Sequence, residues 1–426
     1  ARTTSTTVTF HSLLSRMHAT DDQVYYPEGG LSAWLVVVGA WCAMISSMGL
    51  LNTLAVLHAW VGEHQLKHMS ESNIGWIFSS YAFFLYIGGA QIGPIFDAHD
   101  IKFLLVPGSI GLVLSTICLS FSKEFYQFFL SFGVLGGLSA SLLFTPSVSA
   151  IGHWFSEKRG LATGIACTAG GIGGIIFPLT ILYLAPSIGF GWAIRVVGLM
   201  CAVFCVLACI LCRKRLPHNK QAGAAIDFKA LTEAKYATTT VAVFLVEFAV
   251  FIPYTYISSY AIHMGMAPRD AYLLNAFLNA GAVPGRALPG YVADRMGTFN
   301  VMCMTAAVCT VFMLGMWLPI DYLNVTAINI FAVLFGFWSG AAISLTPVCV
   351  GKMCHTKDYG KRNGTTFSIA SVGCLIGIPI AGAITEANSG GYNGLIILAG
   401  VVYAAATAAF LAVKLMATGG KLNAKF

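Results

Sequence analysis

The sequence has little charge. Only 10% of its 426 residues are Asp, Glu, Lys or Arg, whereas 57% are hydrophobic, and the mean hydropathy is +0.77. A soluble domain carries about 25% charged residues, so this chain cannot cover a water-facing surface with polar side chains. The formal net charge of +7 lies in loops between apolar runs, which argues against a nucleic-acid partner. The composition predicts an integral membrane protein in contact with the lipid bilayer.

The alternation of apolar and polar residues that is typical of an outer-membrane barrel is also absent. Instead, the sequence contains about twelve apolar runs, most of them near the length of roughly 20 residues that crosses a bilayer as a helix. Helices are then the only spanning structure left, and the fold class is all-α membrane protein. The predicted spans are 31–58, 74–96, 102–121, 125–151, 160–184, 190–212, 237–262, 270–292, 299–318, 324–350, 362–386 and 392–415.

Motifs of enzymes are missing as well: there is no nucleophile elbow, Walker loop or His set of a membrane desaturase. Gly170-x3-Gly174 lacks the preceding strand of a nucleotide loop and is interpreted as a helix-packing contact. His64 and His68 have the i, i+4 spacing of a zinc pair, but no further His cluster completes the site, which favours a polar loop. We therefore expect no enzymatic activity, no metal and no cofactor.

Lys and Arg are distributed unevenly between the two sides of the membrane. If the N-terminus is cytosolic, that side holds 19 of the 24, the opposite side holds four, and Arg286 lies inside a span. The positive-inside rule then predicts both termini in the cytosol. We expect the plasma membrane as the location, with an organelle membrane as the alternative. The predicted division is an N-terminal tail (1–30), a first bundle (31–212), a basic linker (213–236), a second bundle (237–415) and a C-terminal tail (416–426).

The two halves repeat each other. Three sequence pairs recur in order, at offsets of 197, 201 and 203 residues: Gly93–Asp97 with Gly290–Arg295, Thr145-Pro146 with Thr346-Pro347, and Lys158-Arg159 with Lys361-Arg362. Three ordered matches at nearly constant offset indicate a duplicated six-helix unit. This arrangement resembles the parallel repeat of the major facilitator superfamily, which implies two six-helix bundles that rock about a site between them.

The repeated loops are candidates for a cytosolic gate. Asp97 and Asp294 follow spans two and eight, and Lys158 and Arg159 precede span five. A carboxylate there can pair with a helix N-terminus or with a cation across the closed side. We predict that these four residues and Arg295 form the gate; the alternative is a set of solvated loop charges.

Two motifs resemble the proton-linked monocarboxylate porters and their fungal relatives. Glu28-Gly29-Gly30 resembles the acidic-Gly-Gly entry to span one of that family, and the longer run from Trp154 through Lys158-Arg159 to Ala166 resembles its entry to span five. The resemblance implies a secondary transporter for a small organic carboxylate that works without a cofactor.

Arg286 is the principal candidate for substrate binding. An arginine inside a membrane span is costly unless it is paired or faces a wet cavity, and its planar fork matches a carboxylate. An inter-helix salt bridge or snorkelling is the alternative. Asn275, Asn279 and Arg286, spaced by 4 and 7 residues, share one helical face that we expect to line the cavity. The resemblance adds that family members carry a substrate-binding Arg at this place.

Two positions depart from the animal members of that family. Where those proteins have an acidic residue one turn before the Arg, this chain has Ala282, and their span-one Lys falls on Asn52. Asn52 can hydrogen-bond a substrate but cannot carry a proton. The resemblance also implies that Tyr86 and Thr346 lie in the cavity; ordinary packing polarity is equally compatible with both.

Glu247 is the only acid deep within a predicted span. A membrane interior favours the neutral form of a carboxyl, so Glu247 is a candidate proton carrier, or else a structural hydrogen bonder. The sequence as a whole predicts a secondary transporter, functional as a monomer, for a small organic anion such as a mono- or dicarboxylate, with protons as a possible second partner. The alternative is an exporter or facilitator of a neutral metabolite or drug-like compound; a membrane enzyme or receptor is less well supported.

Overall fold

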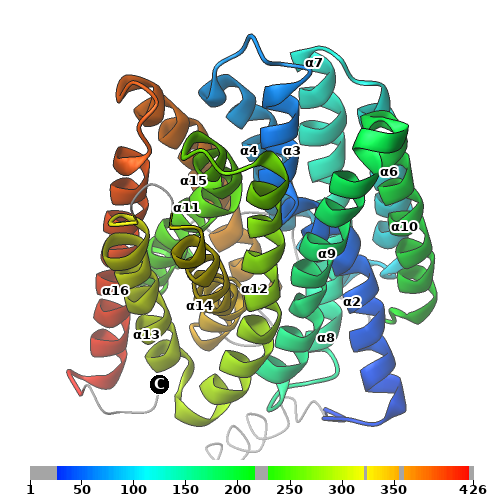
Figure 1. Ribbon diagram of the computed structural model, residues 1–426. Helices are drawn as coiled ribbons and strands as arrows, with labels where there is room; N and C mark the ends of the chain where they lie inside the picture. Colours follow the sequence, from blue (N-terminus) through cyan, green and yellow to red (C-terminus); the bar gives the residue numbers. More distant parts are fainter. Residues whose placement is uncertain (1–25, 216–228, 321–323, 355–358, 422–426) are drawn as a thin grey trace, which may run out of the picture.

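The chain is helical throughout the part that the structure describes. The computed structural model describes residues 26–215, 229–320, 324–354 and 359–421 (Figure 1). Ten helical segments are long and apolar enough to cross a membrane. Two further crossings complete the set. One is the interrupted helix of residues 71–98 in the first half, and the other is the helix Pro268–Met296 in the second half, which contains five charged residues. This architecture confirms the predicted all-helical membrane fold with twelve crossings.

The first half contains the six crossings up to residue 211. Its segments in chain order are α2 (Leu31–Leu51), α3 (Leu54–Glu63), α4 (Glu71–Ile87), α5 (Gly89–Ala98), α6 (Lys102–Phe121), α7 (Phe125–Phe128), the π-helix η1 (Phe129–Gly136), α8 (Gly137–Gly152), α9 (Arg159–Ile188) and α10 (Phe190–Leu211).

The second half contains the other six. Its segments are the 3₁₀ turn η2 (Ala230–Thr232), α11 (Ala234–His263), α12 (Pro268–Met296), α13 (Thr298–Val311), the π-helix η3 (Phe312–Trp317), α14 (Val325–Lys352), α15 (Tyr359–Ala387) and α16 (Asn393–Thr418).

The first two predicted spans are not continuous helices. The span expected at 31–58 is interrupted between α2 and α3, at Asn52 and Thr53, and the span expected at 74–96 is interrupted at Gly88, between α4 and α5. Both predicted spans are present, and each is formed by two successive helices. Interrupted helices are tolerated at membrane depth where protein buries the freed backbone groups, and the side chains of Asn52 and Thr53 are 0% exposed.

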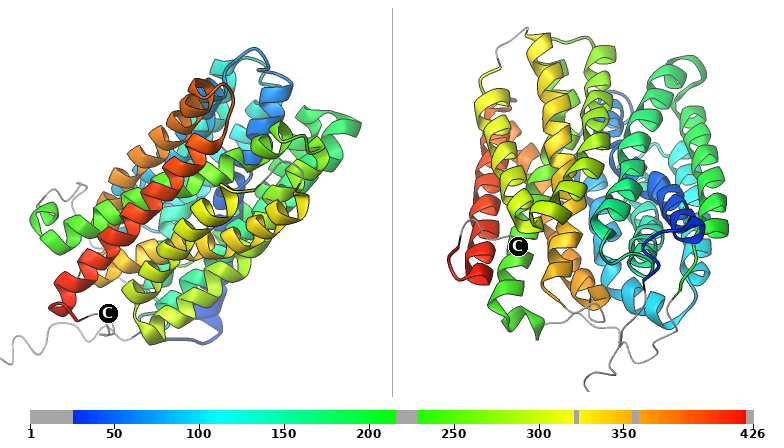
Figure 2. Two further views of the ribbon diagram at one scale, coloured as in Figure 1. Left: turned by 60° about the vertical axis from the view of Figure 1, so that its left-hand side comes forward. Right: turned by 90° about the horizontal axis from the view of Figure 1, so that it is seen from below.

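The two halves lie side by side and contact each other through equivalent helices. Seen from below, the first half occupies one side of the molecule and the second half the other (Figure 2). Contacts between them join α9 to α12, α15 to α4 and α5, and α3 to α11. In each half, these helices belong to the first, second and fifth crossings. We call the end that carries residue 26, the 153–158 loop and the end of α16 the basic end; it lies at the bottom of Figure 1, and the other end is the opposite end.

Burial separates central helices from peripheral ones. About 78% of the α2–α3 span and 83% of α11 are buried within the protein, whereas α10 is only 33% buried. The exposed face of α10 carries apolar side chains such as Leu199, Val203 and Ile210, which suit contact with lipid. The central helices are therefore the ones that can position polar groups away from both lipid and water.

Candidate functional site

Arg286 lies at the interface of the two halves, on α12. Its side chain is 0% exposed, and its Nη1 donates a hydrogen bond of 2.9 Å to the Cys167 carbonyl of α9. The remaining donors, Nε and Nη2, are buried and have no hydrogen-bond partner. These two nitrogens form one edge of the guanidinium. The residue thus holds its position with one donor and presents the other edge for an acceptor.

Glycines of α9 make room for the polar face of α12. A Cβ on Gly170 would collide with Arg286 Nη1 and would lie 3.0 Å from Asn52 Nδ2, so the guanidinium and the Asn52 amide flank the same glycine. A Cβ on Gly174 would collide with the Asn279 side chain. The Gly170-x3-Gly174 pair is therefore a helix-packing contact, as predicted, and it also creates the space for the buried polar groups.

The interruption between α2 and α3 meets the asparagines of α12. The Asn52 carbonyl accepts hydrogen bonds from Asn275 Nδ2 at 3.0 Å and from Asn279 Nδ2 at 3.3 Å. The Asn52 amide itself is buried, and neither its Nδ2 nor its Oδ1 has a partner. The structure thus brings the three predicted asparagines together beside Arg286 and leaves one amide available for a ligand.

Glu247, on α11, joins this cluster from the side of the second half. Its Oε1 accepts a long hydrogen bond of 3.5 Å from Thr346 Oγ1, and the Tyr86 hydroxyl of α4 also interacts with the carboxyl. The charge of Arg286 acts on Glu247, yet Glu247 Oε2 has no hydrogen-bond partner. Four of the predicted site residues, each from a different helix, therefore share one buried region. Within it, Arg286 and Glu247 each have polar atoms without a hydrogen-bond partner.

Aromatic rings surround the polar cluster. The Tyr86 ring lies 5.2 Å from Phe367, 6.2 Å from Phe144 and 6.4 Å from Phe251, measured between centroids. The Tyr254 hydroxyl lies near the Arg286 guanidinium, outside hydrogen-bond geometry with Nε and Nη2, and is 3.3 Å from Ser339 Oγ. Tyr254 and Ser339 were not among the predicted site residues. Only the i, i+7 spacing from Glu247 pointed to Tyr254, and no sequence signal pointed to Ser339.

The predicted gate residues lie at the basic end, where α9 begins. A Cβ on Gly160 would lie 2.6 Å from Asp294 Oδ1, which places this carboxylate at the α9 N-terminus. Arg159 and Asp294 line a cavity of about 270 Å³ between the two halves. The Arg295 guanidinium instead lies over the Tyr291 ring, 4.4 Å from its centroid. The gate function stays a prediction, and the side chain of Asp97 lies outside the described residues.

The two motifs that carry the family resemblance contact each other at the basic end. The Glu28 carboxylate accepts hydrogen bonds from the backbone N–H groups of Ser156, Glu157 and Lys158 at 2.6, 2.8 and 3.1 Å. Partial burial alone would raise the pKa of Glu28, but these three bonds and the charge of Lys158 lower it below its usual value. Glu28 thus caps the loop that leads into α9. Lys158 contributes its backbone to this contact, while its side chain is exposed.

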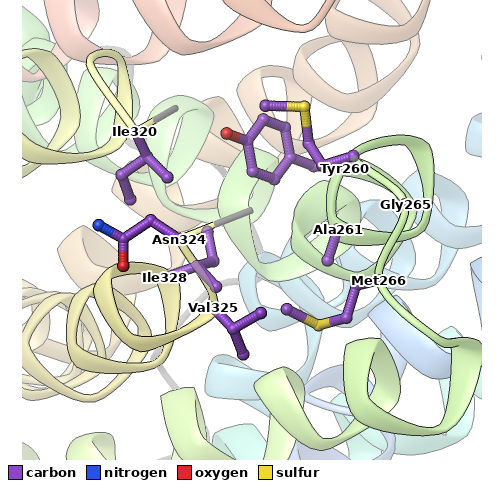
Figure 3. A pocket seen from close by; sticks show the side chains of 9 residues that line it. Tyr260, Ala261, Gly265, Met266, Ile320, Asn324, Val325 and Ile328 are labelled. Atoms are coloured by element: carbon purple, nitrogen blue, oxygen red, sulfur yellow. The ribbon is translucent and has the colours of Figure 1, made fainter. Parts of the chain in front are cut away.

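A small cavity at the opposite end contains none of the predicted residues (Figure 3). It has a volume of about 60 Å³ and is lined mainly by apolar groups such as Tyr260, Met266 and Ile328. Ligand pockets usually measure about 300 to 1,000 Å³, so this cavity is too small for an organic metabolite.

His64, the zinc candidate of the sequence, stacks on Trp60 with ring centroids 4.2 Å apart.

Comparison with known proteins gives consistent matches along the chain. Residues 36–357 match the family model described as Major Facilitator Superfamily. The chain is 34% identical to the MFS transporter asaE of Aspergillus flavus over 403 residues, which cover 94% of this chain and 90% of that protein. It is 32% identical to the riboflavin transporter MCH5 of Saccharomyces cerevisiae over 400 residues, with 88% and 77% covered. It is also 34% identical to the aspyridones efflux protein apdF of Emericella nidulans over 404 residues, with 94% and 82% covered. These similarities extend through both halves.

Proposed function

Because the chain belongs to the Major Facilitator Superfamily of membrane transporters, we propose that it binds an organic metabolite at Arg286 and exports it by alternating access. The chain is an integral membrane transporter and not an enzyme. The preferred substrate carries a carboxylate or carbonyl acceptor and an aromatic or conjugated part. The observation that carries this proposal is the unpaired Nε–Nη2 edge of a fully buried guanidinium.

The unpaired edge favours an acceptor group on the substrate. A buried donor without a partner costs free energy, on the order of 1 to 3 kcal/mol, and more for a charged group. A carboxylate can accept from Nε and Nη2 together, which satisfies both donors with one group. The Asn52 amide, beside Gly170, supplies a further donor and acceptor. A substrate acceptor would thus satisfy the two donors that the protein itself leaves unpaired.

The surroundings favour a larger metabolite over a simple monocarboxylate. Tyr86 and the three phenylalanines around it offer aromatic surface close to Glu247. Asn52 and Ala282 stand where the monocarboxylate porters carry charges, so less of the site is dedicated to a small ion. The names of two relatives, an aspyridones efflux protein and a riboflavin transporter, support a substrate of this kind. The relatives thus support the exporter alternative of the sequence analysis over its first reading.

A small organic carboxylate remains the second candidate. It is supported by Arg286 itself and by the contact between Glu28 and the loop before α9, which joins the two motifs that resemble the monocarboxylate porters. This second candidate corresponds to the monocarboxylate porters, which are a narrower assignment than the superfamily. In this candidate, Glu247 is the residue that would couple transport to protons.

The orientation follows from the charge bias of the sequence. With the basic end in the cytosol, substrate reaches Arg286 from the cavity lined by Arg159 and Asp294, and leaves at the opposite end. The two halves each surround half of the site, so a single chain suffices for the cycle. We propose the plasma membrane as the location, since export needs access to the cell exterior.

Transport by the purified protein in proteoliposomes tests the substrate class. The panel contains lactate, succinate, riboflavin and an aspyridone, each with and without a pH gradient. Arg286→Lys and Arg286→Ala are compared with Arg195→Lys, an arginine of the peripheral helix α10 that contacts Phe121 and Trp192. Each lost charge-assisted hydrogen bond costs about 1.5 to 3 kcal/mol, so transport should fall about tenfold or more at Arg286 only. Unchanged affinity in Arg286→Ala would refute the binding role, and transport of lactate alone would favour the second candidate.

A further inference from the structure

A second cavity lies between the two halves at the opposite end. It has a volume of about 570 Å³, within the range of ligand pockets, is open to the surface, and is lined by α3 and α9 of the first half and the start of α12 of the second. The side chains that carry the argument are those of Trp60, Glu63, His64, Tyr183, Arg269 and Tyr272. We call this space the outer cavity.

Aromatic rings from both halves line the outer cavity. The Trp60 indole is nearly parallel to the rings of His64 and Phe190, at 7° and 11°, and its centroid lies 6.5 Å from that of Tyr272. Tyr183 adds a third aromatic ring to the lining, with the Arg269 guanidinium 5.7 Å from its centroid. Indole and phenol rings bind flat conjugated groups by stacking, and an adjacent guanidinium can stack on the same groups.

The polar atoms of the outer cavity include both donors and acceptors. The exposed Arg269 guanidinium is a donor on the lining. Glu63 Oε2 accepts a hydrogen bond of 2.7 Å from the Tyr272 hydroxyl, and the carboxylate retains further acceptor capacity. A ligand that pairs with both Arg269 and Glu63 must itself carry an acceptor and a donor. This requirement excludes a plain hydrocarbon ring and disfavours a simple carboxylate, which Glu63 would repel.

One face of α12 connects the outer cavity to the central site. Tyr272, Asn275, Asn279 and Arg286 follow each other at spacings of 3, 4 and 7 residues, so they lie along a single stripe. All four side chains are buried against the first half, where Tyr272 bonds Glu63 and the asparagines bond the Asn52 carbonyl. A substrate that moves along this stripe from Arg286 reaches the outer cavity once these bonds open.

We propose that the outer cavity is a second binding site, which holds a planar heteroaromatic substrate with both donor and acceptor groups before its release. Tyr183 stacks on the ring system beside Trp60, Arg269 serves its acceptors, and Glu63 serves its donors. The proposal rests on the proposed function, because it takes the transported metabolite as the occupant.

Protection of a cysteine reporter tests the outer cavity directly. Pro186, which lines the cavity and is exposed, is changed to Cys in a Cys118→Ser background, and a membrane-impermeant thiol reagent is applied from the opposite end. Riboflavin is the probe, since its ring system is planar and carries both carbonyl and N–H groups; ribitol is the control without the ring. We expect riboflavin, but not ribitol, to slow labelling at least fivefold. Ser187→Cys, exposed but outside the lining, should show no protection.

Two further variants distinguish the outer cavity from the central site and from ordinary interface aromatics. Protection should persist with Arg286→Ala and disappear with Trp60→Ala, whereas Trp192→Ala, an exposed tryptophan of α10 outside the cavity, should leave it intact. Loss of protection with Arg286→Ala, or no protection in any background, would overturn the proposal. Because labelling needs no transport, protection without transport in proteoliposomes would instead count against the proposed function alone.

Discussion

Arg286 and Glu247 share one buried cluster without satisfying each other. The guanidinium keeps Nε and Nη2 unpaired, and the carboxyl keeps Oε2 unpaired. A closed ion pair would use these atoms and leave nothing for a ligand. A substrate acceptor would satisfy the guanidinium and a proton would satisfy the Glu247 carboxyl, so we expect substrate binding and protonation to be linked at these two residues.

The first prediction concerns coupling through Glu247. Glu247→Gln keeps the shape and the contact with Thr346 but cannot take up a proton, so we expect it to abolish acceleration by a pH gradient. Exchange at equal pH on both sides should stay within about twofold. Initial rates in proteoliposomes measure both quantities, with Glu157→Gln, an exposed acid of the 153–158 loop, as the control. Full gradient-driven accumulation in Glu247→Gln would make Glu247 a structural residue.

The second prediction concerns the glycine beside the guanidinium. A Cβ at position 170 would collide with Arg286 Nη1 and crowd Asn52, so Gly170→Ala should displace both groups. Overpacking of this kind costs about 1 to 3 kcal/mol, and we expect substrate affinity to fall about fivefold or more. Gly315→Ala, whose Cβ would meet only Val311 at 3.9 Å, should be neutral. Binding titrations on both purified variants check this, and equal affinities would contradict the role of Gly170.

At the scale of elements, the N-terminus of α9 is held by carboxylates from two other segments. Asp294, at the end of α12, lies beside Gly160, and Glu28, before α2, bonds the backbone of the preceding loop. A helix N-terminus carries a partial positive charge, so both carboxylates stabilise it. Only Asp294 crosses from the second half to the first. We therefore expect loss of the Asp294 contact to affect the motion of the halves, and loss of the Glu28 contact to affect stability.

The third prediction assigns Asp294 to the motion of the halves. Asp294→Asn weakens a contact between α12 and α9. If this contact closes the basic end, as predicted, turnover should fall about three- to tenfold while binding changes less than twofold. The expected decrease in turnover corresponds to the free energy of about 1 kcal/mol that a charge contributes at a helix N-terminus. Asp270→Asn, at the other end of α12, is the matched control. A pure loss of affinity would argue against a gate.

The fourth prediction is a pH dependence of stability through Glu28. Its pKa is lowered in the folded protein, so its stabilising effect is present above the ordinary value of 4.5 and disappears as the pH falls through the lowered value. Glu28→Gln should therefore be less stable than the parent by about 1 kcal/mol at pH 7. This difference should stay constant down to about pH 5 and shrink below the ordinary value of 4.5. Thermal unfolding across this pH range measures it, and a constant difference at all pH values would be inconsistent with the role of the charge.

At the scale of the whole molecule, hydrogen bonds join the two halves at the opposite end, and two of them run from tyrosines of the second half to carboxylates of the first. Tyr272 donates to Glu63 at 2.7 Å and Tyr392 to Glu71 at 2.9 Å. The cavity of about 270 Å³ at the basic end lies between the same halves, next to Asp294. The bonds at the opposite end must break when the substrate leaves on that side.

The fifth prediction follows from these two bonds. The double variant Tyr272→Phe/Tyr392→Phe should shift the population towards opening at the opposite end, because a hydrogen bond to a charged group contributes about 1.5 to 3 kcal/mol. A cysteine at Ala59, which lines the neighbouring cavity and is only 5% exposed, reports the opening. Its labelling by an impermeant thiol reagent should rise about tenfold, and Tyr126→Phe should change nothing. Unchanged labelling in the double variant would show that these bonds do not hold the closed state.

The sequence by itself determined the fold class, because twelve apolar runs and a scarcity of charge leave helices in lipid as the only solution. It also singled out Arg286, Glu247 and the asparagines of α12, since buried polar groups stand out within apolar spans. The contact of Asn52 with Asn275, the unpaired guanidinium edge and the outer cavity were decided only by the tertiary structure. These features depend on how α3, α9 and α12 approach each other across the two halves. Helical periodicity in the sequence shows which residues share a face of one helix, but it does not show how far away or in which direction a neighbouring helix lies.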